Sequence, residues 1–353
     1  MSSQPTLPLP RLTLAQAPLT CEIDAINEYG EQQKVSIPAE RALTVYVDKR
    51  ELVTLMTLGA HPELLVLGYL RNQRLVTEVS DIESITVDWD VGAAAVKTRH
   101  GIEDIEEKTA KRVVTTGCGQ GSVFGGLMDE VDQIALPPDA SITQAQLYDL
   151  VNTIRLKETT YKSAGSVHAC ALFSCGPAGP EMLLFVEDVG RHNAIDTIAG
   201  WMWVSMAPTL RTDVSSRGLA GRRSPEASLL SPVQSCSSSS GAAGSSPSGA
   251  LRLRPGEAGS AAPAGKEEAE GLVFYTTGRL TSEMVIKSAQ MNVPIVVSRS
   301  GITQMGHQVA QAVGLCAIGR ATNKRFVCYS SPHRLHLQPE LAGPKLRATT
   351  TEP

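Results

Sequence analysis

A cysteine flanked by glycines is the residue of this sequence best placed for covalent chemistry. Gly117 and Gly119 border Cys118, and a β-branched run from Val113 to Thr116 leads into it. Glycines have no Cβ, so they permit unusual backbone conformations and keep bulk away from the thiol. A thiol that is accessible and can ionise is a nucleophile. The pattern favours a reactive Cys118 on a loop after a strand over the alternative, a small buried apolar residue.

Two strand-to-helix junctions in the last third of the chain each contain an arginine. They are 278–279, after a predicted strand at 272–275, and 299–301, after a predicted strand at 294–298. Helix starts after the strands of an α/β sheet expose backbone N–H groups that attract anions. A phosphate site is one interpretation of these junctions. Ordinary turn chemistry also explains their glycines, so both interpretations stay open.

Periodic patterns predict the elements that position these residues. Strands are predicted at 43–47, 52–56, 85–91, 167–173, 182–186, 272–275, 294–298, 315–318 and 326–329. Helices are predicted from 62 to 70, around 147–154 with a capping box of Ser141 and Gln144, towards 203, over 282–291 and up to 313. The first third is therefore a β-rich unit with one helix. Alternating strands and helices in the second half predict a parallel sheet covered by helices.

Composition places the chain in a broad class. It has 353 residues, a formal net charge of −4 and seven cysteines, an odd and scattered set that is no disulfide framework. We expect a cytoplasmic protein in a reducing compartment, with neither nucleic acid nor a membrane as a partner. Residues 207–270 contain no aromatic residue and are rich in Ser, Gly, Ala, Pro and Arg, which predicts a disordered insertion. Whether it is natural or a gene-prediction artefact stays open.

Several motifs in order then resemble one family, the formate dehydrogenase accessory sulfurtransferases (FdhD). They are Glu-Arg-Ala-Leu-Thr-Val-Tyr-Val (40–47), Thr-Thr-Gly-Cys-Gly (115–119), Val-Glu-Asp-Val-Gly-Arg-His-Asn-Ala-Ile-Asp (186–196), Thr-Gly-Arg-Leu-Thr-Ser-Glu-Met-Val (277–285) and Arg-Phe-Val-Cys-Tyr (325–329). The resemblance covers roughly residues 20–206 and 271–335.

The resemblance implies a function, a fold and partners. Members of the family act as homodimers that take sulfur from a cysteine desulfurase as a persulfide. They pass it to the molybdenum cofactor, bis-molybdopterin guanine dinucleotide, of formate dehydrogenase. The persulfide cysteine of the family's Cys-x-x-Cys loop matches Cys118, and the second cysteine falls on Gly121. One reactive thiol per carrier is chemically sufficient. The cofactor is a bound substrate, and we expect no metal held directly by the protein.

The family's cofactor-binding segment matches eight consecutive residues near the C-terminus. They are Ile318, Gly319, Arg320, Ala321, Thr322, Asn323, Lys324 and Arg325. Three cationic side chains in this segment suit a ligand with guanosine diphosphate arms. The alternative is a solvated turn between two strands.

The resemblance also implies an α/β fold with a cytidine-deaminase-like layered sheet and helices. The residue patterns add a smaller β-rich N-terminal unit, and the composition adds a disordered insertion. The expected parts are a flexible N-terminus (1–20), the β-rich unit ending in the Cys118 loop (21–135), the deaminase-like domain (136–206 and 271–335), the insertion (207–270) and a flexible tail (336–353).

Other functions compete with the sulfur carrier. A zinc deaminase needs His-x-Glu and Pro-Cys-x-x-Cys, which the sequence lacks. An unusual metal site at His168, Cys170, Cys175 and His192 is conceivable, as is a hydrolase pairing Cys118 with His192. A non-catalytic cofactor-binding chaperone is a further alternative. A last group, Asp188, Arg191 and His192, lies between a strand and a helix and either binds a ligand or shapes the turn.

Overall fold

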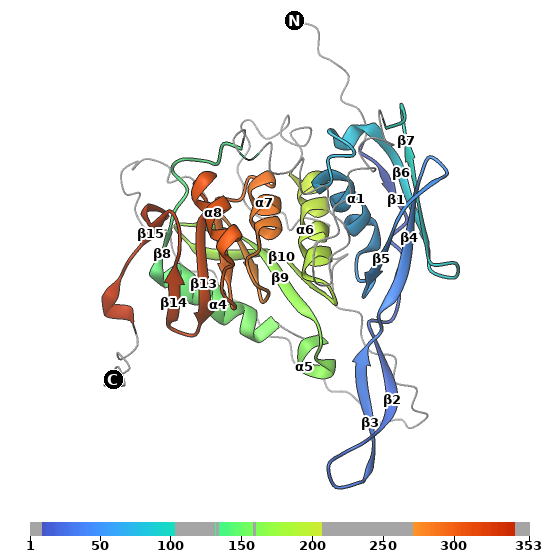
Figure 1. Ribbon diagram of the computed structural model, residues 1–353, viewed down its shortest axis with the longest axis horizontal. Coiled ribbons are helices and arrows are strands. Elements are labelled where there is room, and N and C mark those ends of the chain that lie inside the picture. The colour runs from blue at the N-terminus through green and yellow to red at the C-terminus, as the bar shows by residue number, and fades with distance from the viewer. Residues whose placement is uncertain (1–8, 103–130, 132–133, 158–159, 207–270, 343–353) are drawn as a thin grey trace, which may run out of the picture. The chain divides into compact units, whose positions relative to one another are not determined.

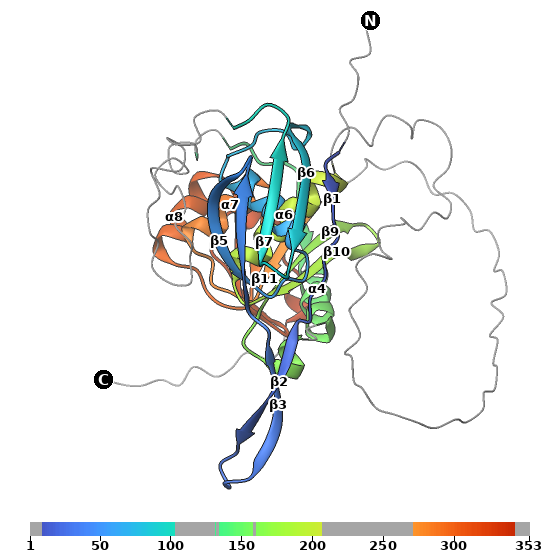
Figure 2. The ribbon, with the colours of Figure 1, turned by 90° about the vertical axis from the view of Figure 1, so that its right-hand side faces the viewer.

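The computed structural model describes two large β-sheets with helices between them (Figures 1 and 2), together with two two-stranded sheets. The described residues are 9–102, 131, 134–157, 160–206 and 271–342. Cys118, the rest of its loop and the segment 207–270 lie outside them. Within the described residues, the fold is mixed α/β with six α-helices.

The first sheet has five strands in the order β1-β6-β7-β4-β5. Their bounds are Arg11–Leu12 (β1), Arg41–Val47 (β4), Arg50–Thr57 (β5), Ile82–Asp88 (β6) and Ala93–Thr98 (β7). The alternation in β4 is confirmed, because Leu43, Val45 and Val47 are buried and the residues between them are less so.

Two details of this sheet differ from the sequence expectation. The alternation that predicted a strand to residue 91 ends at Asp88, because its side chain accepts a hydrogen bond from the backbone of Asp90 and starts a turn. The predicted strands did not include β7. It begins with three alanines, which are poor strand formers, and it is held by pairing with β4 and β6 on either side.

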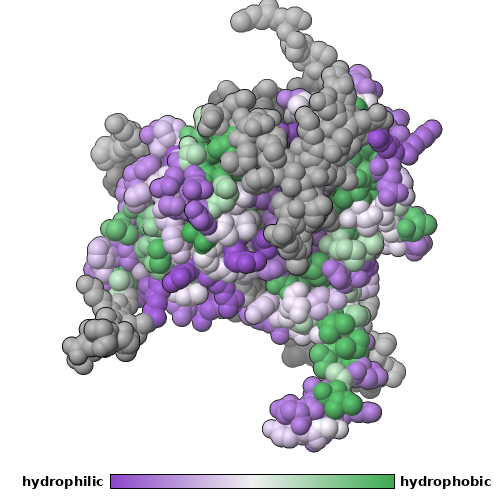
Figure 3. Space-filling view, in the orientation of Figure 1, coloured by the Kyte–Doolittle hydropathy of each residue, from purple (hydrophilic) through white to green (hydrophobic). Residues whose placement is uncertain are grey.

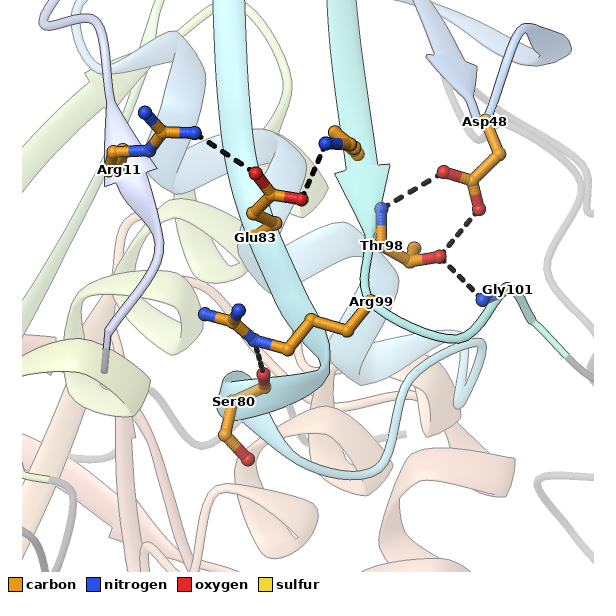
Figure 4. A network of polar contacts seen from close by, with 8 residues as sticks. Arg11, Asp48, Ser80, Glu83, Thr98, Arg99 and Gly101 are labelled. Atoms are coloured by element: carbon orange, nitrogen blue, oxygen red, sulfur yellow. Dashed lines mark hydrogen bonds and ion pairs between the residues drawn. The ribbon is translucent and has the colours of Figure 1, made fainter. Parts of the chain in front are cut away.

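Charged and polar residues at one end of this sheet form hydrogen bonds and ion pairs between its strands and turns (Figure 4). Asp48, in the turn between β4 and β5, accepts hydrogen bonds from the backbone and hydroxyl of Thr98 at 3.0 and 2.5 Å. Glu83 lies 2.7 Å from the Lys97 ammonium and 3.1 Å from Arg11. Hydrogen bonding to Lys97 lowers the pKa of Glu83. These bonds tie β1, β6 and β7 to each other and β7 to the β4–β5 turn.

The second sheet has six strands in the order β10-β9-β11-β12-β13-β14. Their bounds are His168–Gly176 (β9), Gly179–Asp188 (β10), Gly271–Thr276 (β11), Ile295–Ser298 (β12), Cys316–Thr322 (β13) and Arg325–Cys328 (β14). The prediction of a parallel sheet is right for β11, β12 and β13 only. Strands β9 and β14 run antiparallel to their neighbours, because short turns connect β9 to β10 and β13 to β14.

Helices cover both faces of the second sheet. Their bounds are Pro62–Asn72 (α1), Gln144–Lys157 (α4), Thr160–Ala164 (α5), Arg191–Ser205 (α6), Ser282–Gln290 (α7) and Gln304–Ala312 (α8). Helix α4 packs its buried Leu147, Leu150 and Ile154 on one face. Helices α6, α7 and α8 lie on the other, and α1 lies between α6 and the first sheet (Figure 1).

The capping box of α4 lies two residues later than predicted. Thr143 accepts a hydrogen bond from the backbone of Gln146, and the Gln146 side chain accepts one from the backbone of Thr143. Ser141 instead bonds to His336. The shift arises because Ile142–Thr143 forms a short strand, β8, which pairs with β15, Leu335–His336. Part of the expected flexible tail is thus regular structure.

A hairpin that the sequence patterns did not predict connects β1 to β4 along the chain. It consists of β2 (Thr20–Ile26) and β3 (Gln32–Pro38). Hydrophobic residues gather on its surface (Figure 3), among them Ile23 and Ile26, which are 42% and 70% exposed. Among the described residues, no helix is long and apolar enough to cross a membrane.

Helices α1 and α6 touch backbone to backbone. A Cβ on Gly68 would overlap the carbonyl oxygen of Asp196, and one on Gly200 would overlap the carbonyl oxygen of Leu64. Only glycine allows this approach, since any side chain would force the two helices apart. The sequence therefore contains two glycines inside helices, where glycine is otherwise unfavourable.

We predict that Gly200→Ala lowers the free energy of unfolding by about 3 kcal/mol or more, because the methyl group meets rigid backbone. Gly301→Ala is the matched control, since its Cβ would meet nothing nearer than the Tyr329 hydroxyl at 3.9 Å. Urea unfolding of both variants checks the prediction. Equal stabilities of the two variants would contradict the helix contact.

Candidate functional site

The carboxyl ends of four strands meet at one edge of the second sheet. Strands β10 and β11 both run antiparallel to β9, so they run parallel to each other, and β12 and β13 continue in the same direction. Ligands of α/β sheets bind at this edge, where strands lead into loops and helix starts.

An arginine lies near the carboxyl end of each of these strands or in the junction that follows it. Arg191 begins the helix after β10, Arg279 and Arg299 lie in the junctions after β11 and β12, and Arg320 lies in β13. The last three are exposed. The side chains of Arg279 and Arg320 form no hydrogen bond or ion pair with the residues that the structure describes. Their charges are therefore available to an anion.

Hydrogen bonds lock the two junctions against each other. Ser298 donates to the carbonyl of Gly278 at 2.7 Å, and Ser300 donates to the carbonyl of Thr277 at 2.8 Å. The backbone N–H of Arg320 donates to the carbonyl of Ser300 at 2.6 Å. The junctions and Arg320 thus form one rigid edge. A rigid edge can bind an anion without first being ordered.

Two glycines make room at this edge. A Cβ on Gly278 would lie 2.7 Å from Cδ of Arg191, and one on Gly319 would lie 2.9 Å from the carbonyl oxygen of Ser300. Larger residues would push Arg191 off the end of β11 or separate β13 from the 299–301 junction. The positions of two arginines therefore depend on these glycines.

Asp188 shapes the turn between β10 and α6. Its carboxylate accepts hydrogen bonds from the Thr57 hydroxyl, the backbone of Leu58 and of Gly190, and the Asn193 amide, at 2.5 to 3.2 Å. It is 3% exposed, and burial raises its pKa although these bonds oppose the shift. Asp188 thus fits the alternative of a residue that shapes the turn, and it connects the end of β5 to the site edge.

His192 lies beneath the edge beside a buried ion pair. Its Nδ1 is 3.5 Å from Glu283, and Lys287 is 2.9 Å from Asp196. Burial and the charge of Lys287 lower the pKa of His192 to about 3. The imidazole is therefore neutral at physiological pH.

This shift predicts how stability depends on pH. His192 accepts a proton near pH 6.5 when unfolded but only near pH 3 when folded. Acidification below 6.5 therefore favours the unfolded state, and stability returns as pH rises. When the pH falls from about 7.5 to about 5.5, proton binding to His192 in the unfolded chain should lower the free energy of unfolding by about 1.4 kcal/mol. The measurement is urea unfolding at both pH values.

His192→Gln should lack that part of the loss, and the exposed His333→Gln serves as its control. Equal losses in the wild type and in His192→Gln would show that His192 is not held neutral by the fold.

The structure separates the predicted cofactor segment into two parts. Ile318, Gly319 and Ala321 are buried in the strand, whereas Arg320 and the segment 322–325 are exposed. Arg320 belongs to the arginine edge, which comprises Arg191, Arg279, Arg299 and Arg320 at the carboxyl ends of the strands. Arg325 pairs with Thr322 and closes the hairpin to β14. The Tyr148 hydroxyl donates to the carbonyl of Lys324 at 3.1 Å. The segment therefore presents its cations at an edge and at a turn, which suits an extended ligand.

The competing metal site finds no support in the described geometry. No group of three His, Cys, Asp or Glu residues among the described ones could hold a metal ion. Cys170 bonds to the Thr276 hydroxyl, and burial raises the pKa of both Cys170 and Cys175 to about 12. Both thiols are therefore protonated at neutral pH in the metal-free chain.

Comparison with known proteins identifies the family. The sequence matches the FdhD/NarQ family over residues 38–224 and 258–336. This chain belongs to the FdhD/NarQ family. The family match includes the Cys118 loop, the arginine edge and the cofactor segment.

Curated relatives in the family match almost the whole chain. "Sulfur carrier protein FdhD" of Bacillus subtilis is 26% identical over 317 residues, which are 87% of this chain and 94% of the relative. The protein of the same name from Wolinella succinogenes is 22% identical over 309 residues, 88% of this chain and 85% of the relative.

A crystal structure shares the fold. It is that of "a putative formate dehydrogenase accessory protein from Desulfotalea psychrophila". The TM-score is 0.58 and the sequence identity 18%, and the match covers 90% of this chain and 100% of that one. At this identity the similarity shows the fold alone.

Proposed function

We propose that this protein is a sulfur carrier for formate dehydrogenase maturation. In this proposal Cys118 accepts sulfur from a cysteine desulfurase as a persulfide, and the sulfur passes to bis-molybdopterin guanine dinucleotide bound at the arginine edge. The family and the names of its curated relatives support the carrier role. The observation that carries the cofactor site is the set of four arginines at the carboxyl ends of four strands that run in one direction.

The chemistry of the edge fits a cofactor with diphosphate groups. Guanidinium groups bind phosphate oxygens through two parallel charge-assisted hydrogen bonds. Arg279 and Arg320 have no described partner to displace, so binding a phosphate breaks no ion pair there. The exposed Lys324 and Arg325 can reach the outer part of a long ligand.

We predict that Arg279→Ala and Arg320→Ala each weaken binding of guanosine diphosphate about tenfold or more, because each removes a charge-assisted bond worth about 1.5–3 kcal/mol. Added salt should reduce the affinity of the wild type more than that of either variant. Isothermal titration measures both effects.

Arg155→Ala is the control, because Arg155 is exposed on α4 and bonds only to Asn152 among the described residues. If both site variants bind guanosine diphosphate with wild-type affinity, the cofactor does not bind at this edge.

The proposed carrier residue differs from the two buried cysteines of β9. Cys170 and Cys175 have strongly raised pKa values, and their burial keeps them from a partner protein. Glycines flank Cys118 in sequence. All five described cysteines are free thiols, which fits the proposed cytoplasmic location.

We predict that Cys118→Ser abolishes the mass gain of one sulfur atom that a cysteine desulfurase and cysteine produce, and leaves formate dehydrogenase inactive. Cys170→Ser and Cys175→Ser should still load sulfur. Mass spectrometry of the intact chain and complementation of a strain lacking this protein measure the two effects.

Complementation by Cys118→Ser would favour the second candidate function, a chaperone that holds and delivers the cofactor. The arginine edge suits that role equally, since its guanidinium groups can bind the phosphates of the cofactor without any transfer of sulfur. The homodimer is proposed on the family resemblance, and light scattering of the purified chain tests it.

A further inference from the structure

Two cysteines on neighbouring strands lie close enough to react with each other. The sulfur atoms of Cys316 in β13 and Cys328 in β14 are 3.9 Å apart. Ile318 pairs directly with Cys328, so Cys316, two residues earlier, lies on the same face of the sheet. A disulfide, with its bond of about 2.05 Å, needs a further approach of roughly 2 Å. Strand β14 is the edge of the sheet, so it can shift without breaking a second set of strand pairings.

The two thiols differ in access and acidity. Cys316 is fully buried, whereas Cys328 is partly exposed. The hydrogen bond between the two sulfur atoms lowers the pKa of Cys328 to about 7, and the same bond, with burial, raises the pKa of Cys316. The lowered pKa increases the fraction of Cys328 that is thiolate at neutral pH. Cys328 suits the role of attacking nucleophile, and Cys316 that of the thiol that reacts second.

The pair lies beside the buried start of the cofactor segment. Cys328 pairs with Ile318, the first residue of that segment, and Cys316 begins β13 two residues earlier. Arg320 and the exposed residues 322–325 lie further along, towards the carboxyl end of the strand. We propose that Cys328 and Cys316 form a dithiol that accepts the outer sulfur of a persulfide and releases it as sulfide beside the cofactor segment. The proposal rests on the proposed sulfur-carrier function and names a second sulfur-handling site for it.

The reaction balances in two steps. The Cys328 thiolate attacks the outer sulfur of a persulfide R–S–SH, which leaves R–S⁻ and forms a Cys328 persulfide. The Cys316 thiol then attacks the inner sulfur of that persulfide, and its proton leaves with the released sulfide. The Cys316–Cys328 disulfide forms, so two thiols are oxidised and the persulfide sulfur is reduced by two electrons.

A dithiol meets a chemical need that Cys118 alone does not. A metal binds sulfur as sulfide, which is more reduced by two electrons than the outer sulfur of a persulfide. A single thiol can pass this sulfur on but cannot reduce it without a second thiol. Gly121 stands where the family's loop pattern has a second cysteine. In this chain, Cys316 and Cys328 supply the two thiols.

The test uses the full-length Cys118→Ser chain, reduced and desalted, with one equivalent of glutathione persulfide. Cys118 is removed so that only the dithiol is measured. We expect about one sulfide per chain, a mass loss of two hydrogen atoms and a Cys316–Cys328 disulfide in the peptide map.

Two further substitutions in that background separate the roles. Cys316→Ser should trap the Cys328 persulfide, seen as a mass gain of one sulfur without sulfide release. Cys328→Ser should show neither the gain nor the release. Cys21→Ser is the control, because Cys21 is exposed on hairpin β2–β3, and it should behave like the parent chain.

Sulfide release that persists in Cys328→Ser, or the absence of a disulfide in the parent chain, would overturn the proposal. Alkylation of the parent chain tests the same roles without a further variant. Iodoacetamide should modify Cys328 before Cys316, and the rate of Cys328 modification should rise with pH with a midpoint near pH 7. Faster modification of Cys316 would also overturn it.

A second arm distinguishes the persulfide's source. Wild-type protein loaded by a cysteine desulfurase, then desalted, should release sulfide if Cys118 is the donor. Release with glutathione persulfide alone would assign a low-molecular-weight donor to the dithiol. A wild-type chain that never loads Cys118 would contradict the carrier function and leave the dithiol reaction standing.

Discussion

The buried ion pair between Lys287 and Asp196 is the contact on which the arrangement of the helices depends. Their side chains are 2% and 4% exposed and lie 2.9 Å apart. Burial alone would lower the pKa of Lys287, but Asp196 and Glu283 raise it, so the ammonium stays charged. Asp196 also accepts a hydrogen bond from Asn72 at 2.7 Å. One carboxylate of α6 thus binds α7 through Lys287 and α1 through Asn72. Loss of either charge would leave the other unpaired in the interior, at a cost of about 3–5 kcal/mol.

The position of the arginine edge follows from this contact. Helix α6 begins at Arg191, and α7 follows the junction that contains Arg279, so fixing the two helices fixes two of the four arginines. Asp188 then joins the first sheet to the same edge through Thr57 and Leu58. His192 beneath the edge is neutral and adds no further positive charge. The positive charge is therefore concentrated in the guanidinium groups, three of which face solvent.

Local patterns predicted much of the fold, and long-range pairing explains what they missed. The alternation of β4, the proline at the start of α1 and the strand–helix order after residue 271 all predicted correct elements. Strand β7 was missed because its alanines fit a strand only between two partners. The capping box was misplaced because β15, nearly 200 residues later in the chain, pairs with residues 142–143.

Sequence patterns predicted only part of the candidate site. They place Arg279 and Arg299 at helix starts, whereas the position of Arg191 and Arg320 at the same edge follows only from the strand order of the second sheet. Cys316 and Cys328 looked unremarkable in sequence. Only the register of β13 against β14 makes them neighbours. The sequence signal that could have found them is a pair of cysteines on either side of a predicted hairpin turn, at positions whose side chains lie on the same face of the two strands.

A crystal structure of the protein with guanosine diphosphate tests the central claim most directly. We predict that the diphosphate lies at the carboxyl ends of β11, β12 and β13, with its oxygens on the guanidinium groups of Arg279 and Arg320. A diphosphate bound elsewhere, with both of these side chains still turned to solvent, would contradict the account.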